Sequence, residues 1–145
     1  MIIIGRKDRI DLPELEIFDL EAKIDTGAYG SALHCHRFEV INKDGQEMLS
    51  YMVLDPSHPE YNNKMLLAKE FSYKIVKSSN GSEEKRYTII TAVRIFGEEF
   101  STEFSLTDRN EMKYPVLLGR KFLSNRFLVN VKLKDISHKT LNKKP

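Results

Sequence analysis

The sequence predicts an all-β protein, a closed barrel or a sandwich, built as one domain. Short apolar runs rich in β-branched and aromatic residues recur at hairpin spacing, with turn signals between them. Helical periodicity is almost absent, and one short helix is expected, at residues 120–125. A chain of 145 residues fits a single domain and buries about 68–70% of its unfolded surface. These observations favour a barrel or sandwich over a helical or mixed fold.

Three strands are expected in the first third of the chain. Residues 2–4 are a β-branched run and predict a strand at a sheet edge or a dimer interface. Residues 5–13 are charged and turn-prone, so a connection is expected there. Residues 15–25 alternate apolar and polar side chains, as a strand with one buried face does. Residues 31–41 are the next expected strand.

The middle of the chain predicts hairpins around one loop. Asp44-Gly45 is a strong hairpin turn signal between residues 31–41 and a returning strand at 48–54. Residues 55–63 contain two prolines and several turn formers, so they predict a loop, either one that caps a cleft or a solvated connection without a role. Further strands are expected at residues 65–68, 71–77, 86–96 and 100–106, with turns at 78–81 and 97.

At the C-terminal end, the apolar residues 116–118 lead through Gly119 into the expected helix, and a final strand is expected at residues 127–133. The remaining residues, 134–145, contain four lysines and few apolar side chains. The sequence therefore predicts a folded domain over residues 1–133 and a basic, flexible tail over residues 134–145.

Composition excludes several classes of partner. The chain is 41% hydrophobic and 30% charged, with a net charge of +2, so no general field for nucleic acid is expected. Cys35 is the only cysteine, which rules out an intramolecular disulfide and fits a reducing compartment. The apolar residues 1–4 are far too few for a signal peptide or a membrane span. We therefore expect a cytoplasmic protein without a membrane partner.

The strand expected at residues 15–25 ends on a carboxylate. Its apolar side chains occupy every second position from Phe18 to Ile24, so Asp25 falls on the polar face. Gly27 then permits a backbone conformation or a close approach that a Cβ would prevent. The tight loop is expected to present Asp25 rigidly, although Asp-x-Gly is also ordinary turn chemistry.

Two motifs together resemble known enzymes. The run Asp25-Thr26-Gly27-Ala28 after a hydrophobic strand resembles the catalytic loop of aspartic proteases, and its single copy in a short chain resembles the retropepsin type. Residues 115–120, Pro-Val-Leu-Leu-Gly-Arg, resemble the hydrophobic-hydrophobic-Gly-Arg segment that lies across this loop in retropepsins. The order and spacing of both motifs suit that fold.

Four strings narrow the resemblance to one bacterial family: residues 22–28, Ser31-Ala32-Leu33-His34, Asp108-Arg109 and residues 117–120. They are similar to those of the family long labelled ATP-dependent zinc proteases. Members resemble retropepsins in fold, and some are associated with ATP-grasp ligases that add glutamate tails, which the peptidase trims. The similarity runs from Gly5 to Val131. One departure is Val129-Asn130, where the family usually has Val-Asp.

The resemblance implies a retropepsin-like closed β-barrel and an aspartic peptidase. Aspartic proteolysis needs two carboxylates about 3 Å apart that share one proton. This chain has one such residue, so a C2 homodimer would bring Asp25 against its symmetry mate. Thr26 would then hydrogen-bond across the two loops, Gly27 would allow a close approach, and Ala28 would form a small wall.

The substrate expected from the resemblance is a glutamate-rich peptide or tail. Arg86, Arg109 and Arg120 lie beside apolar runs, and a guanidinium can hold a carboxylate through two hydrogen bonds. They are candidate substrate-binding residues, with structural ion pairing as the alternative for each.

Metal and cofactor chemistry is not expected. His34 and His36 would lie on one face of a strand, but the sequence offers no further ligand apart from the distant His58 and His138. No phosphate-binding glycine loop is present, so any ATP would belong to a partner enzyme. Cys35 would face away from its neighbouring histidines, which argues against a thiol nucleophile.

The sequence thus predicts a homodimeric aspartic peptidase without a metal or cofactor. The alternatives are a non-catalytic peptide-binding module of the same fold and, less favoured, a zinc-dependent protease.

Overall fold

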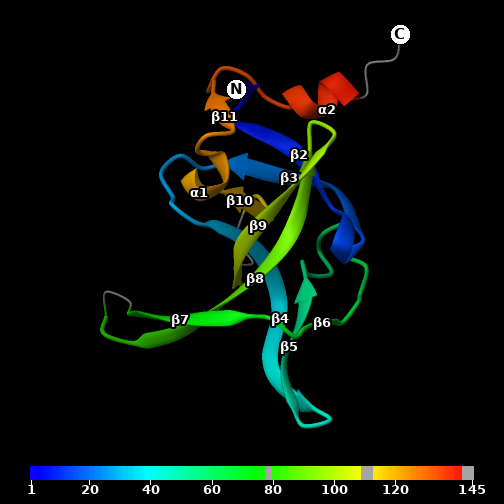
Figure 1. The fold of residues 1–145 in the computed structure, drawn as a ribbon, viewed down its shortest axis with the longest axis vertical. Coiled ribbons are helices and arrows are strands. Elements are labelled where there is room, and N and C mark those ends of the chain that lie inside the picture. Colours follow the sequence, from blue (N-terminus) through cyan, green and yellow to red (C-terminus); the bar gives the residue numbers. More distant parts are fainter. Residues whose placement is uncertain (78–79, 109–112, 142–145) are drawn as a thin grey trace.

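The computed structural model describes residues 1–77, 80–108 and 113–141 (Figure 1). The strands are β1 (Ile2–Ile4), β2 (Lys7–Leu12), β3 (Ile17–Ile24), β4 (Ser31–Lys43), β5 (Gln46–Val53), β6 (Leu66–Ala68), β7 (Ser72–Lys77), β8 (Glu83–Ile95), β9 (Glu98–Thr107), β10 (Val116–Leu118) and β11 (Phe127–Val129). The helices are a 3₁₀ turn η1 (Pro13–Leu15), α1 (Arg120–Leu123) and α2 (Ile136–Leu141).

Six strands close into a barrel, which confirms the predicted fold class. Their order around the barrel is β10, β3, β2, β8, β9 and β4. The short strand β10 closes the ring because it pairs in parallel with β3 and antiparallel with β4. A closed barrel leaves no unpaired edge in the ring, so its backbone groups are satisfied within the sheet.

Two hairpin arms extend from the barrel (Figure 1). Strand β4 continues beyond the ring to pair with β5, and β8 continues to pair with β7. The first arm turns at Asp44-Gly45, whose φ angles are 53° and 83°, the left-handed pair that an Asp-Gly turn supplies. The predicted hairpin is therefore confirmed.

Strand β2 corrects the prediction that residues 5–13 form a turn-prone connection. Alternate residues of Lys7–Leu12 are buried, and the inward positions are Asp8, Ile10 and Leu12. The sequence does not show an alternation of apolar and polar residues here, because the buried position 8 is occupied by a carboxylate, a group that is rarely found in a core.

Side chains from all barrel strands form one continuous core. The largest fully buried side chains include Phe104, Ile10, Leu20, Leu33, Leu106 and Leu118. Beside the barrel, β1 and β11 form a separate two-stranded parallel sheet with Ile3 opposite Leu128. The last strand ends at Val129, four residues earlier than expected, and the predicted short helix is α1.

Helix α2 differs from the flexible tail predicted for residues 134–145. The carboxylate of Asp8 accepts hydrogen bonds from the backbone N–H groups of Ser137 (2.9 Å) and His138 (3.2 Å). The hydroxyl of Ser137 in turn accepts one from the N–H of Phe96 (2.7 Å). These contacts dock the helix on β2 and on the turn between β8 and β9. The structure thus has two α-helices, whereas the sequence predicts only one.

No helix among the described residues is long and apolar enough to cross a bilayer.

Candidate active site

Asp25 follows directly after β3, on a loop whose conformation is stabilised by hydrogen bonds from its backbone N–H groups. The N–H of Asp25 donates to the carbonyl of Leu118 (2.8 Å), which ties the start of the loop to β10. The N–H of Gly27 donates to Asp25 Oδ1 (3.1 Å), and the N–H of Ala28 donates to the Asp25 carbonyl (3.3 Å). The carboxylate is therefore held in one orientation and is only partly buried.

Residues that follow β10 hold the far side of the same loop. The backbone N–H of Arg120 donates to the carbonyl of Ala28, and that of Lys121 to the carbonyl of Tyr29, both at 2.8 Å. The guanidinium of Arg120 donates to the carbonyl of Thr26 (3.0 Å) and lies over the Tyr29 ring. The hydrophobic-hydrophobic-Gly-Arg segment thus lies against the Asp25 loop, as in the fold that the sequence resembles.

Gly119 lies where the two segments come closest. A Cβ on this residue would be 2.2 Å from the carbonyl oxygen of Gly30 and 2.8 Å from that of Ala28. Its N–H donates to the hydroxyl of Ser31 (3.1 Å). The glycine is required here by the distance between the two backbones.

A pocket of about 390 Å³ opens beside this loop. Its lining includes the loop residue Ala28 and three cationic side chains, Lys74, Arg86 and Lys121, with Glu103 as the only anionic one among the residues that line it. Lys121 lies 3.7 Å from Glu103. Among the described residues, Arg86 Nε is buried without a hydrogen-bond partner. The pocket can therefore receive an anionic group.

The predicted site residues fall into three groups. Asp25, Thr26, Gly27, Ala28 and Arg120 meet at the loop, and Arg86 lies in the wall of the adjacent pocket. The guanidinium of Arg120 is engaged with the loop itself. Arg109 lies outside the described residues.

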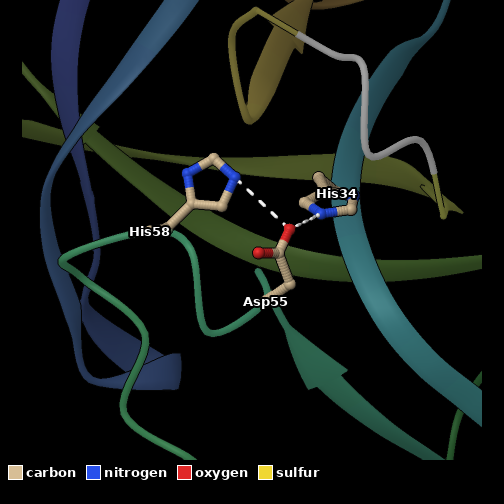
Figure 2. Close-up of side chains that lie close together, drawn as sticks. All are labelled: His34, Asp55 and His58. Carbon is tan, nitrogen blue, oxygen red and sulfur yellow. Dashed lines mark hydrogen bonds and ion pairs between the residues drawn. The ribbon is translucent and has the colours of Figure 1, made fainter.

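His34 and His36, expected on one face of a strand, have different partners. His36 donates from Nδ1 to the carbonyl of Leu54 (2.7 Å) and packs edge-on against Tyr61. His34 faces Asp55 and His58, which lie on the loop that follows β5 (Figure 2). In the sequence, the Asp-x-x-His spacing of residues 55–58 could have indicated two members of this cluster. Only the fold brings these two residues next to His34 on β4.

Asp55 is the centre of that cluster. Its Oδ2 lies 2.6 Å from His34 Nε2 and 3.5 Å from His58 Nε2. Hydrogen bonds from Ser57 and then from His34 hold the pKa of the Asp55 carboxyl well below its usual range. The side chain is therefore an ionised carboxylate at neutral pH.

Cys35 is not a nucleophile. The side chain is fully buried, and burial raises the pKa of the thiol far above its usual value. A thiol that stays protonated is inert, which agrees with the prediction from strand alternation.

A six-stranded barrel with an Asp-Thr-Gly loop locked by a hydrophobic–Gly–Arg segment defines a retropepsin-like fold. A family model described as "RimB-like: Retropepsin-like aspartic endopeptidase RimB" matches residues 3–140, and the chain belongs to this family. The comparisons give the family this name and do not bear out the label of ATP-dependent zinc protease that the sequence suggested.

Curated relatives of the chain carry a different name. A "Probable alpha-L-glutamate ligase" of Shewanella pealeana is 32% identical over 132 residues, which are 88% of this chain and 28% of that protein. One of Desulfotalea psychrophila is 28% identical over 149 residues, or 97% of this chain and 31% of that protein. The chain thus spans less than a third of the length of these relatives.

A solved structure shares the fold. The crystal structure of a Legionella pneumophila protein of unknown function superposes with a TM-score of 0.70 at 23% identity. The similarity covers 94% of this chain and 98% of the other.

Proposed function

We propose that the chain is an aspartic peptidase that hydrolyses peptide bonds as a homodimer, with one Asp25 from each subunit. The observation that carries the proposal is the Asp25 loop, whose carboxylate is oriented by Gly27 and whose backbone is locked by residues 118–121. Such rigid presentation is what a positioned catalytic group needs. Membership of a retropepsin-like aspartic endopeptidase family supports the same conclusion.

The chemistry requires a second carboxylate beside the first. Two Asp25 side chains about 3 Å apart cannot both ionise, so the pair shares one proton. The ionised member takes a proton from water, whose oxygen attacks the scissile carbonyl, while the protonated member donates to the carbonyl oxygen. A C2 axis through the two loops supplies this pair. Thr26 would hydrogen-bond across the axis.

Acidic, glutamate-rich peptides are the proposed substrates. The pocket beside the loop brings Lys74, Arg86 and Lys121 together against a single carboxylate among its lining residues, and a guanidinium binds carboxylates well. The relatives named alpha-L-glutamate ligase point to the same chemistry. We further propose a functional link with a glutamate ligase of the ATP-grasp class. We also propose that the protein acts in the cytoplasm, where reducing conditions suit the single thiol of Cys35.

The pocket equally suits a non-catalytic peptide-binding module. Substitution of Asp25 separates the two functions. With glutamate-rich peptides, Asp25→Asn is expected to reduce hydrolysis to the uncatalysed background while peptide binding largely persists. The matched control is Asp44→Asn, which removes an exposed carboxylate from a turn with a positive φ that Asn tolerates well.

Hydrolysis that survives in Asp25→Asn would overturn the peptidase assignment for this residue. Binding without hydrolysis in the native chain would favour the binding module. Sedimentation at rising protein concentration tests the dimer independently, since a persistent monomer would leave the Asp25 carboxylate without its partner.

A further inference from the structure

We propose that His34, Asp55 and His58 form a binding site for one divalent transition-metal ion of the Zn²⁺ type. One ligand atom from each side chain lies within 4.8 Å of the others. Figure 2 shows both imidazole rings directed at the carboxylate, His34 from β4 and His58 from the loop after β5.

The spacing fits a tetrahedral ion. With bonds of about 2.0–2.1 Å, two ligand atoms of a tetrahedral Zn²⁺ lie about 3.3 Å apart. Asp55 Oδ2 lies 2.6 Å from His34 Nε2 and 3.5 Å from His58 Nε2, on either side of this value. All three ligand atoms lie within 4.8 Å of one another, so side-chain movement is needed to admit the ion.

The donor set selects the class of metal. Two imidazoles and one carboxylate are typical ligands of Zn²⁺ and of similar transition metals, whereas Mg²⁺ and Ca²⁺ prefer oxygen atoms alone. Three protein ligands leave a fourth position for water. A cavity of about 460 Å³, lined by His36, Asp55, Ser57 and Asp108, gives solvent access to Asp55.

Neighbouring groups already orient the ligands. Ser57 donates its N–H and its hydroxyl to Asp55 Oδ1, so that Oδ2 is the oxygen directed at both histidines. His34 Nδ1 lies 3.3 Å from the carbonyl of Thr107. A proton on Nδ1 that is donated to this carbonyl leaves Nε2 as the metal ligand, which is the usual outer-shell arrangement of a metal-binding histidine.

The proposed site is distinct from the Asp25 loop. The two are tied to opposite ends of β10, since the N–H of Asp25 donates to the carbonyl of Leu118 and that of His34 to the carbonyl of Pro115. A metal at His34, Asp55 and His58 would anchor the loop of residues 55–63 to β4. The inference therefore goes beyond the proposed peptidase and does not depend on it.

The test is a calorimetric titration of metal-free protein with Zn²⁺. The native chain is expected to bind one equivalent, and His58→Gln to bind more than about 100-fold more weakly, because losing a ligand costs at least as much as losing an outer-shell partner. His58 lies on a loop, so the variant is expected to fold. His138→Gln on α2 is the matched control and is expected to bind as the native chain does.

Thermal unfolding gives a second measurement that needs no activity. Zn²⁺ should raise the Tm of the native chain and of His138→Gln, but not that of His58→Gln. If His58→Gln does not fold, Asp55→Asn replaces it with the same expectation. The absence of a one-equivalent site in the native chain, or equal binding by His58→Gln, would overturn the proposal and leave an ion pair only.

Discussion

At position 119 a glycine is required because the backbone of the Asp25 loop lies too close for a Cβ. Its φ of −94° is accessible to any residue, but the carbonyl oxygens of Ala28 and Gly30 approach to within the space of a Cβ. Both oxygens belong to backbone that carries the Asp25 loop. The residue therefore fixes how closely β10 can approach that loop.

Gly119→Ala is expected to lower the free energy of unfolding by about 2–3 kcal/mol or more, because the new methyl group meets backbone that cannot rotate away. Urea unfolding measures the loss. The control is Gly30→Ala, since a Cβ at Gly30 has no other atom within 4 Å. Equal stability of the two variants would contradict the argument.

Among the elements, β2 and α2 depend on each other. The carboxylate of Asp8 is fully buried, and such a group is stable only when its oxygens are hydrogen-bonded. It accepts from the N–H groups of Arg9, Ser137 and His138. The helix therefore satisfies a core acid, and the acid offsets the positive end of the helix.

Asp8→Asn is expected to destabilise the chain by about 1–3 kcal/mol, because the amide offers one oxygen where the carboxylate offers two, and a buried N–H then lacks an acceptor. Hydrogen exchange should show faster exchange of the α2 amides. His138→Gln keeps the same backbone donor and should exchange as the native chain does. Unchanged protection in Asp8→Asn would show that α2 docks without the acid.

For the whole molecule, the proposed dimer needs an apolar face. Ile3 and Leu128 are paired neighbours on the small β1–β11 sheet, and they are 49% and 56% exposed. Exposed apolar side chains that lie next to each other, unlike single ones, mark association surfaces. This sheet pairs the first strand of the chain with the last, near the top of the molecule (Figure 1).

Leu128→Lys is expected to shift the assembly from dimer to monomer by at least about tenfold in dissociation constant, since a charge at the core of an interface must be desolvated. Sedimentation velocity over a concentration series measures the shift. Ile90→Lys, at an exposed position on β8 outside the small sheet, is the control. If Leu128→Lys leaves the association unchanged, the dimer forms through another surface.

The features of the fold that the sequence predicted correctly depend on residues close together in the chain. Local patterns were sufficient for the Asp44-Gly45 hairpin, for the strand that ends just before Asp25, and for the short apolar β10. Each of these depends on neighbours within a few residues, which a strand's period of two or a turn's backbone requirement expresses directly.

The sequence by itself determined the all-β class, every strand of the barrel except β2, and the loop that carries Asp25. Only the tertiary structure decided that Asp8 lies in the core, that α2 docks on it, and that His34 meets Asp55 and His58. The physical reason is that these contacts join residues far apart in the chain, 129 positions in the case of Asp8 and Ser137. A charged residue at a core position is stable only when it is hydrogen-bonded, and here the hydrogen-bond donors come from a distant part of the chain.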